Sequence, residues 1–275
     1  MTIVHAILLV GGKGTRLLPH TADQPKALIR LGRYAILEII LRRLRAFGFD
    51  RVTLCVSHLG EMIRAEFGSG AALGLSIEYS VDERPLGTAA PLLLTENWDT
   101  PAVVMNGDIL TTIDFGDLLR RHQARQSLLT VAFVRRRLSA GVGLVRVIDG
   151  RIREVLEKPT FDLNVSSGIY AVSPAARKYI PRGGPADMPD LINALIRHDE
   201  PVHGYGFSGA WHDIGTPLRY DEARKAFEAD PDRYLGPDPA TGRDQPADGA
   251  PGAGLDDLAA GLDVGVLLDR SEARA

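Results

Sequence analysis

An apolar segment that leads directly into a glycine-rich loop near the N-terminus constrains the fold of this chain more than any other feature. Residues 3–10 are mostly apolar and predict a first, fully buried strand, and Gly-Gly-Lys-Gly-Thr-Arg-Leu follows at residues 11–17. Glycines allow left-handed backbone angles and close approach of a ligand, and backbone N–H groups turned inward form a concave anion site. Arg16 and Lys26 add cationic donors that suit phosphate oxygens, so the loop predicts a triphosphate site. The nucleotide-binding residues expected in the loop are Gly11, Gly12, Gly14 and Thr15.

Two better-known phosphate-binding loops do not fit this pattern. A Walker A loop requires Ser or Thr directly after Gly-Lys, and Gly14 stands at that position. A dinucleotide-binding fingerprint requires a third glycine where this chain has Leu17. A glycine-rich turn with surface cations remains as the structural alternative, but such a turn does not require Arg16 and Lys26 at these positions.

Apolar runs alternate with helical periodicity through the first half of the chain, for example a helix from residue 36 to 47 and strands at 51–57, 75–80 and 102–105. A further helix is expected to begin near Pro91. This alternation predicts an α/β fold with a single Rossmann-like, mainly parallel sheet and helices on both faces. Ligands of such sheets bind beyond the carboxyl ends of the strands.

Strand patterns follow one another more closely after about residue 128, at residues 129–134, 142–147, 152–156 and 165–172. They predict a partly antiparallel extension beside the site. Two helices follow, with Asp187 as an expected N-cap of one and Thr216-Pro217 opening the other.

The composition changes near the C-terminus and suggests three parts. Residues 1–235 are expected to form one domain. Residues 236–254 are dominated by Pro, Gly, Asp and Ala and predict a disordered linker. Residues 255–275 form a tail in which apolar spacing suggests a weak helix.

Charge and hydropathy exclude several classes of protein. The net charge of −3 over 275 residues argues against a general nucleic-acid binder. The sequence contains no apolar run of the length that spans a membrane, and the first residues lack the pattern of a secretory leader. The single cysteine, Cys55, lies in an apolar segment and is expected to be a core residue in a reducing, cytoplasmic protein. A homo-oligomer remains possible.

The segment GGKGTRLLPHTADQPKAL at residues 11–28 resembles the sugar-1-phosphate nucleotidylyltransferases, and later motifs extend the resemblance to about residue 234. The resemblance implies a GT-A-like nucleotidyltransferase fold that transfers a nucleoside monophosphate from an NTP to a sugar 1-phosphate, releasing pyrophosphate. A phosphate monoester has a second pKa of about 6, so the nucleophile is already ionised near neutral pH. The chemical task is therefore alignment and charge neutralisation, and Arg16 and Lys26 are the expected catalytic cations.

Two further motifs imply a magnesium site. Asn-Gly-Asp at residues 106–108 follows a predicted strand, and Trp-His-Asp-Ile-Gly at residues 211–215 resembles the family's Trp-x-Asp-Ile-Gly. By that resemblance Asp108 and Asp213 bind Mg²⁺, which takes one or two carboxylates together with phosphate oxygens.

The resemblance also implies which residues bind the sugar phosphate. Glu157-Lys158-Pro159 matches the family's Glu-Lys-Pro, in which the Glu holds sugar hydroxyls and the Lys holds the phosphate. Gly143 matches a glycine whose backbone faces the sugar, and Ser166 stands in the sugar-pocket strand where many relatives have Asn. Val142 replaces a frequent Tyr, so the identity of the sugar stays open.

Base contacts are expected from the first glycine loop and from the loop that contains Glu83, Gly87 and Thr88. Glu83 could accept from the N1–H and N2–H₂ edge of guanine. The Val-Gly-Gly form of the first loop resembles mannose- or heptose-1-phosphate guanylyltransferases, so GTP is the expected nucleotide. Thymidylyl, uridylyl, adenylyl or cytidylyl transfer, a non-catalytic nucleotide-sugar sensor and a glycosyltransferase remain as alternatives, and pyrophosphate release distinguishes the transferase reading from the last two.

Overall fold

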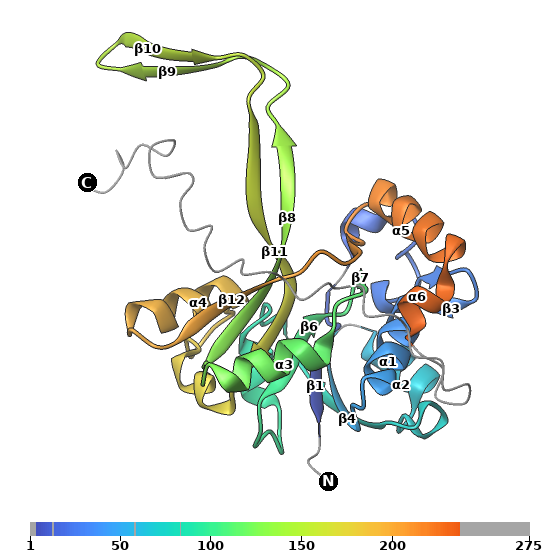
Figure 1. Ribbon diagram of the computed structural model, residues 1–275. Helices are drawn as coiled ribbons and strands as arrows, with labels where there is room; N and C mark the ends of the chain where they lie inside the picture. The colour runs from blue at the N-terminus through green and yellow to red at the C-terminus, as the bar shows by residue number, and fades with distance from the viewer. Residues whose placement is uncertain (1–3, 13, 58, 83, 237–275) are drawn as a thin grey trace.

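The computed structural model describes residues 4–12, 14–57, 59–82 and 84–236, so Glu83, the predicted linker after Gly236 and the predicted tail lie outside the described residues. A seven-stranded sheet forms the centre of the molecule, in the order β12-β8-β11-β6-β1-β4-β5 (Figure 1). Its strands are β1 (His5–Leu9), β4 (Arg51–Val56), β5 (Ser76–Val81), β6 (Ala102–Asn106), β8 (Leu129–Ser139), β11 (Thr160–Val172) and β12 (Val202–Gly206).

The sheet is mainly parallel. β1 pairs in parallel with both β4 and β6, β4 with β5, and β12 with β8. β11 lies between β6 and β8 and is antiparallel to both. The predicted α/β class, with a mainly parallel sheet and an antiparallel part, is confirmed.

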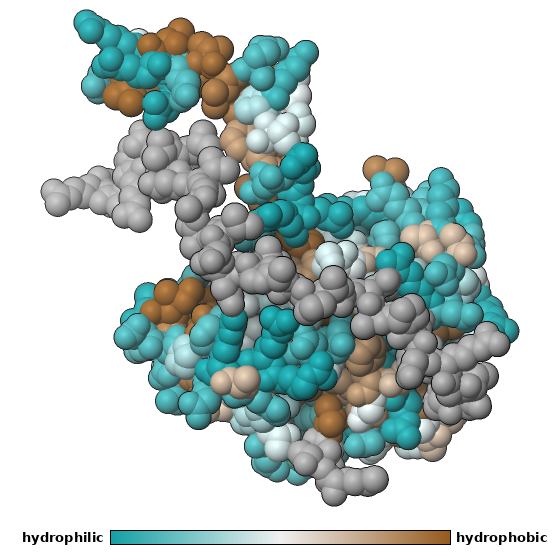
Figure 2. Space-filling view, in the orientation of Figure 1, coloured by the Kyte–Doolittle hydropathy of each residue, from teal (hydrophilic) through white to brown (hydrophobic). Residues whose placement is uncertain are grey.

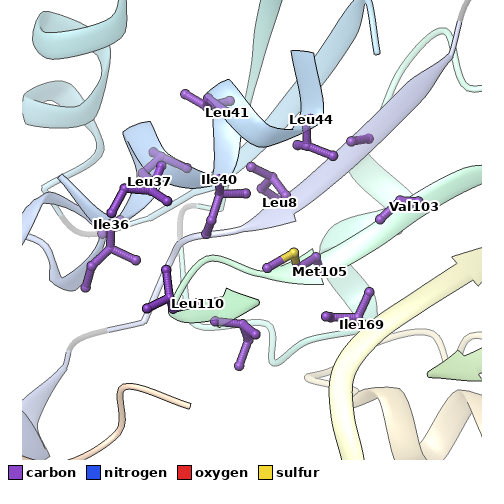
Figure 3. Packing of buried hydrophobic residues seen from close by; sticks show 14 of the residues in the cluster. Leu8, Ile36, Leu37, Ile40, Leu41, Leu44, Val103, Met105, Leu110 and Ile169 are labelled. Carbon is purple, nitrogen blue, oxygen red and sulfur yellow. The ribbon is translucent and has the colours of Figure 1, made fainter. Parts of the chain in front are cut away.

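Helices cover both faces of the sheet, because successive strand residues point to opposite sides. Leu8, Val103 and Met105 face helix α1 in one buried cluster (Figure 3). Ile7 and Val104 face α4 in a second cluster. The helices are α1 (Ile36–Ala46), α2 (Gly60–Phe67), α3 (Phe115–Ala124), α4 (Met188–Arg197), α5 (Pro217–Ala229) and α6 (Pro231–Leu235).

The helix ends follow local sequence signals. Asp187 caps α4 in a reciprocal capping box with Asp190, and the Thr216 hydroxyl accepts from the Arg219 N–H, 3.4 Å away, at the start of α5. Near Pro91 the structure has a 3₁₀ helix, η4 (Ala90–Leu94), in place of the expected α-helix. Helix α3 was not expected from the sequence, although Asp114 caps it through a 2.7 Å bond from the Asp117 N–H.

β8 and β11 are longer than predicted and continue beyond the sheet as a two-stranded arm (Figure 1). At its end, β9 (Leu144–Ile148) and β10 (Arg151–Leu156) pair with each other as a separate hairpin. Two shorter pairs complete the strands, β2 (Arg30–Leu31) with β3 (Tyr34–Ala35), and β7 (Ile109–Thr111) with β13 (Trp211–Asp213). Over the described part of the chain, the helices are too short or too polar to traverse a bilayer.

Candidate active site

The glycine loop follows the carboxyl end of β1. Hydrogen bonds from Ser57, which follows the neighbouring strand β4, and from Thr21 hold it in place. The Ser57 hydroxyl donates to the Gly11 carbonyl, and a Cβ at Gly11 would lie 2.9 Å from that hydroxyl oxygen. Gly14 has a φ of 64°, and its carbonyl accepts from the Thr21 hydroxyl at 2.8 Å. Larger residues at these two positions would clash or be strained, so the glycines are required by the loop itself.

A cavity of about 760 Å³ opens at the carboxyl ends of the strands. This position is where a mainly parallel sheet is expected to bind its ligand. Seven of the predicted site residues line it: Gly11, Gly12, Thr15, Lys26, Gly87, Thr88 and Asp108.

Asp108 and Lys26 form an ion pair in this cavity. Lys26 Nζ donates to Asp108 Oδ2, and both side chains are largely shielded from solvent. Asp108 follows Gly107, whose N–H donates to the Leu9 carbonyl at 2.9 Å and whose Cα lies too close to Val10 for any side chain. Gly107 therefore lets the loop carrying Asp108 approach the end of β1.

Asp213 lies next to Asp108 although 105 positions separate them in sequence. β13 pairs antiparallel with β7 so that Asp213 is opposite Ile109, and the Ile214 N–H donates to the Asp108 carbonyl at 3.0 Å. The Asp213 carboxylate also accepts from Arg219 at 2.7 Å. The pairing of two short strands thus makes the backbones of Asp108 and Asp213 neighbours, and of the two side chains Asp108 lines the cavity while Asp213 lies outside its lining.

These carboxylates fit a hard divalent cation. Asp108 Oδ1 is buried and has no hydrogen-bond partner among the described residues, so one oxygen is free for a ligand. Within the described residues, no three His, Cys, Asp or Glu side chains are grouped closely enough to hold a metal by themselves. Magnesium commonly takes one or two carboxylates and completes its shell with water and substrate phosphates, so two carboxylates are sufficient.

Gly87 and Thr88 are held by the N-terminus of α4. Asp187 Oδ1 accepts from the Thr88 N–H at 2.9 Å and from its hydroxyl at 3.1 Å, and that hydroxyl accepts from the Met188 N–H at 2.8 Å. A Cβ at Gly87 would lie 2.6 Å from the Ala186 carbonyl oxygen. The loop is therefore shaped by α4, and the Thr88 hydroxyl already has both a donor and an acceptor as partners.

Asp82 is a cavity residue to which the sequence assigned no role of its own, the predicted base contact being the neighbouring Glu83. Asp82 directly follows β5, is 7% exposed and lines the cavity beside Cys55. Its Oδ1 is buried without a hydrogen-bond partner among the described residues. Burial raises the pKa of this carboxyl to about 6. Its position one residue beyond a strand of the parallel sheet was the available signal.

The remaining predicted residues lie outside the cavity lining. Arg16 is exposed on the 3₁₀ helix η1 (Thr15–Leu17). Gly14 is part of the glycine loop and provides the left-handed turn in it. The four residues assigned to the sugar phosphate are all exposed. Gly143, Glu157 and Lys158 lie where the arm meets the hairpin, and Ser166, opposite Phe133, lies where β11 leaves the sheet.

Three of those four residues form one group. A Cβ at Gly143 would lie 3.2 Å from Glu157 Oε2, and Glu157 Oε1 is 3.9 Å from Lys158 Nζ. Lys158 has a φ of 44°, a backbone conformation that is costly for a residue with a side chain. An exposed ion pair at this distance contributes little to stability, and Lys158 lies in the turn between β10 and β11.

Comparison with known proteins identifies the family of this chain. Residues 5–230 match the nucleotidyl transferase family model. The mannose-1-phosphate guanylyltransferase of Mycobacterium tuberculosis is 34% identical over 246 residues, which cover 86% of this chain and 67% of that protein. The mannose-1-phosphate guanylyltransferase catalytic subunit beta of Danio rerio is 33% identical over 222 residues, covering 77% of this chain and 61% of that protein.

Among solved structures, HddC from Yersinia pseudotuberculosis complexed with GMP-PN has a TM-score of 0.63. The match covers 82% of this chain and all of that chain, at 20% sequence identity, and supports the fold. The family match spans most of the chain, including the glycine loop, Asp108 and Asp213. The chain belongs to the nucleotidyl transferase family.

Proposed function

We propose that this protein transfers a guanylyl group from GTP to a mannose- or heptose-type sugar 1-phosphate, with release of pyrophosphate. The observation that carries the proposal is the single cavity in which the glycine loop, Lys26 and Asp108 meet, with Asp213 on the adjoining strand. The choice of GTP and of a mannose-type sugar is supported by the two guanylyltransferases similar to this chain.

Each group has a role that follows from its charge and position. The N–H groups of the glycine loop and the Lys26 ammonium bind the triphosphate, and Arg16 joins them from the adjoining 3₁₀ helix. Asp108 and Asp213 hold Mg²⁺, which when bound neutralises charge on the phosphates. Glu157 and Lys158 hold the sugar 1-phosphate.

Base recognition is assigned to the cavity wall formed by the loop after β5. The buried Oδ1 of Asp82 lacks a donor, and guanine presents two adjacent N–H donors on its N1 and N2 edge. Uracil and adenine lack that donor pair. The neighbouring Glu83, outside the described residues, remains the contact expected from sequence alone.

A reducing, cytoplasmic setting is proposed for this reaction. Cys55 is buried, and burial raises the pKa of its thiol to about 12, so the thiolate is not available for oxidation or exchange. Its role is that of a small core residue.

The proposal is tested by supplying the purified protein with Mg²⁺, each of GTP, ATP, UTP, CTP and dTTP, and a panel of sugar 1-phosphates, with pyrophosphate as the readout. GTP with mannose or heptose 1-phosphate is expected to give the highest kcat/KM. If kcat/KM is higher with another nucleotide, that nucleotide is the substrate and the proposal of GTP is wrong. If the protein binds a nucleotide sugar but releases pyrophosphate from no substrate pair, the proposed catalytic function is wrong and the protein is a nucleotide-sugar-binding protein.

Asp82→Asn is expected to raise the KM for GTP by about 10- to 100-fold, because hydrogen bonds to a charged group are worth about 1.5–3 kcal/mol. Wild-type KM for GTP should also rise as the pH falls below about 6, where this carboxyl becomes protonated, and the variant should lack that dependence. Steady-state kinetics between pH 5 and 8 measure both effects.

The same substitution should stabilise the ligand-free protein. The folded pKa of Asp82 lies above its unfolded value, so the folded state binds the proton more tightly and stability falls as pH rises from about 4 to about 6. Above pH 6 the asparagine variant should therefore be more stable, by at most about 3 kcal/mol. Asp99→Asn, at an exposed carboxylate, is the control and should change neither property. An unchanged KM for GTP in Asp82→Asn would remove this residue from base recognition.

Lys158→Ala is expected to raise the KM for the sugar 1-phosphate by about 10- to 100-fold, since it removes a charged hydrogen bond to phosphate. The KM for GTP should stay nearly unchanged. Lys178→Ala is a matched control, because Lys178 is equally exposed and also pairs at 3.9 Å, with Glu200. Equal effects of Lys158→Ala on both KM values would count against the assigned role.

A further inference from the structure

Asp213 forms an ion pair with Arg219 to which the proposed function gives no role. Arg219 donates to Asp213 Oδ2 at 2.7 Å, and Asp213 is its ion-pair partner within the described residues. The carboxylate lies over Gly215, where a Cβ would be 3.2 Å from Asp213 Oδ1. It is outside the cavity lining, to which Asp108 belongs. The pair therefore keeps one of the two carboxylates assigned to magnesium engaged outside the cavity.

Arg219 stands at a position of α5 that favours the opposite charge. Thr216 caps α5, so Arg219 is the third residue of the helix, where a capping box has Glu or Gln. The N-terminus of a helix carries partial positive charge and repels a cation. In the described chain, each of the other α-helices has an acidic residue in its first turn, and α5 has none. The helix itself therefore disfavours an arginine here, and the bond to Asp213 is the favourable contact that this side chain makes.

The ion pair is of a kind that can exchange partners. The side chains of Arg219 and Asp213 are 54% and 32% exposed, and Figure 2 shows mostly hydrophilic surface over α5. A partly exposed ion pair contributes little to stability, because water solvates both charges when they separate. Lys26 differs, since its side chain is only 13% exposed and bonds to Asp108 inside the cavity. Arg219 can therefore leave its carboxylate more readily than Lys26 can.

The first turn of α5 also lies beside residues 18–24, which follow the glycine loop. The rings of His20 and Tyr220 are 4.9 Å apart between their centroids. Thr21, the next residue after His20, lines the cavity. Arg219 precedes Tyr220 and is therefore close in the fold to the proposed triphosphate site. A guanidinium presents a fork of donors that matches the oxygens of a phosphate as well as those of a carboxylate.

We propose that Arg219 controls the availability of Asp213 by exchanging partners. It pairs with Asp213 in the free protein and with a substrate phosphate once the triphosphate is bound, and Asp213 is then free for the divalent cation. This inference rests on the proposed function, because it takes Asp213 as a magnesium ligand. It makes binding of the cation at Asp213 depend on binding of the phosphate, so the cation alone is bound weakly.

Binding of Mn²⁺ to the full chain without nucleotide tests the competition for Asp213. Mn²⁺ prefers the same oxygen ligands as Mg²⁺, and the electron paramagnetic resonance signal of free Mn²⁺ gives its Kd. Arg219→Gln should bind Mn²⁺ about 3- to 10-fold more tightly than the wild type, because a competing cation is removed. Arg224→Gln is the matched control. It removes the same charge from α5, where Arg224 pairs with Glu228 at 3.0 Å, and should change the Kd by less than about twofold.

Asp213→Asn shows whether the gain depends on this carboxylate. Added to Arg219→Gln, it should abolish the tighter binding of Mn²⁺, because the ligand that the first substitution released is then lost. If Arg219→Gln binds Mn²⁺ no more tightly than the wild type, or if the gain survives Asp213→Asn, the proposal is wrong.

Binding of inorganic tripolyphosphate in the presence of EDTA tests the exchange to phosphate. By calorimetry, Arg219→Gln should bind it about 10-fold more weakly than the wild type, because a charged hydrogen bond is lost, and Arg224→Gln should not. Equal binding to the wild type and Arg219→Gln would overturn the proposal. Neither measurement involves catalysis or the base. A protein that releases no pyrophosphate would therefore refute the proposed function without changing these results, and equal affinities would refute this inference alone.

Discussion

Asp108→Asn is expected to lower kcat by about 10³-fold while leaving the fold intact, a loss at the upper end of those seen when one electrostatic group is removed from an active site. Asparagine has nearly the same shape as aspartate but lacks its charge. Asp108 Oδ1 is buried without a donor, and Oδ2 accepts from Lys26, so the carboxylate is positioned to share its charge between a cation and the lysine. Pyrophosphate release at saturating substrates and thermal unfolding measure the two properties.

Magnesium dependence gives this prediction a second readout. The variant's residual activity should require a higher Mg²⁺ concentration, because one carboxylate of the proposed site is lost. Asp221→Asn on the exposed side of α5 removes the same charge from a surface ion pair and should change neither kcat nor the Mg²⁺ requirement. If Asp108→Asn keeps more than about a tenth of wild-type activity, the metal assignment fails.

The parts of the fold that could be predicted depend on local sequence. β1, β4 and β6 are short apolar runs between helical segments, and the glycine loop follows the first of them at the edge where ligands bind. The cap of α4 was equally local, since Asp187 and Asp190 bond to each other's backbone within one turn. Helix α3 has a comparable local signal, since Asp114 is followed by apolar residues at helical spacing.

Features that depend on pairing between distant segments were harder to predict. The strand predicted at residues 129–134 stops before three arginines, Arg135 to Arg137, yet β8 continues to Ser139 because β11 pairs with it there. Arg137 bonds to Asp162 across that pairing at 3.0 Å, and both faces of the arm are open to water, so charged residues are tolerated there. Hydrophobic alternation marks a strand only where one of its faces is buried.

The candidate site also has parts that local sequence predicts and parts that depend on contacts between distant segments. The motifs around Asp108 and Asp213 were recognisable separately, but only the pairing of β7 with β13 explains why they are neighbours. The importance of Asp82 depends on burial and a missing hydrogen-bond partner, which are properties of the folded chain. The positions of Glu157 and Lys158 on the arm depend on where β8 and β11 leave the sheet.

Lys26→Met is expected to lower kcat/KM for GTP by about 10²- to 10³-fold, because it removes a largely shielded cation of the proposed triphosphate site. It should also destabilise the ligand-free protein by about 1–3 kcal/mol, since Asp108 then keeps a shielded charge with no donor. Lys225→Met, at an exposed lysine of α5, is the control for loss of charge alone.

The response of this variant to Mg²⁺ distinguishes a metal-binding Asp108 from one that serves only to hold the lysine. With Lys26 replaced, both oxygens of Asp108 are available, so Mg²⁺ without nucleotide should raise the thermal midpoint of Lys26→Met more than that of the wild type. The added Asp108→Asn substitution should abolish this extra stabilisation. If Mg²⁺ shifts the single and double variants equally, Asp108 is a partner of Lys26 alone, and the proposed metal would have to be held by Asp213 and the substrate phosphates.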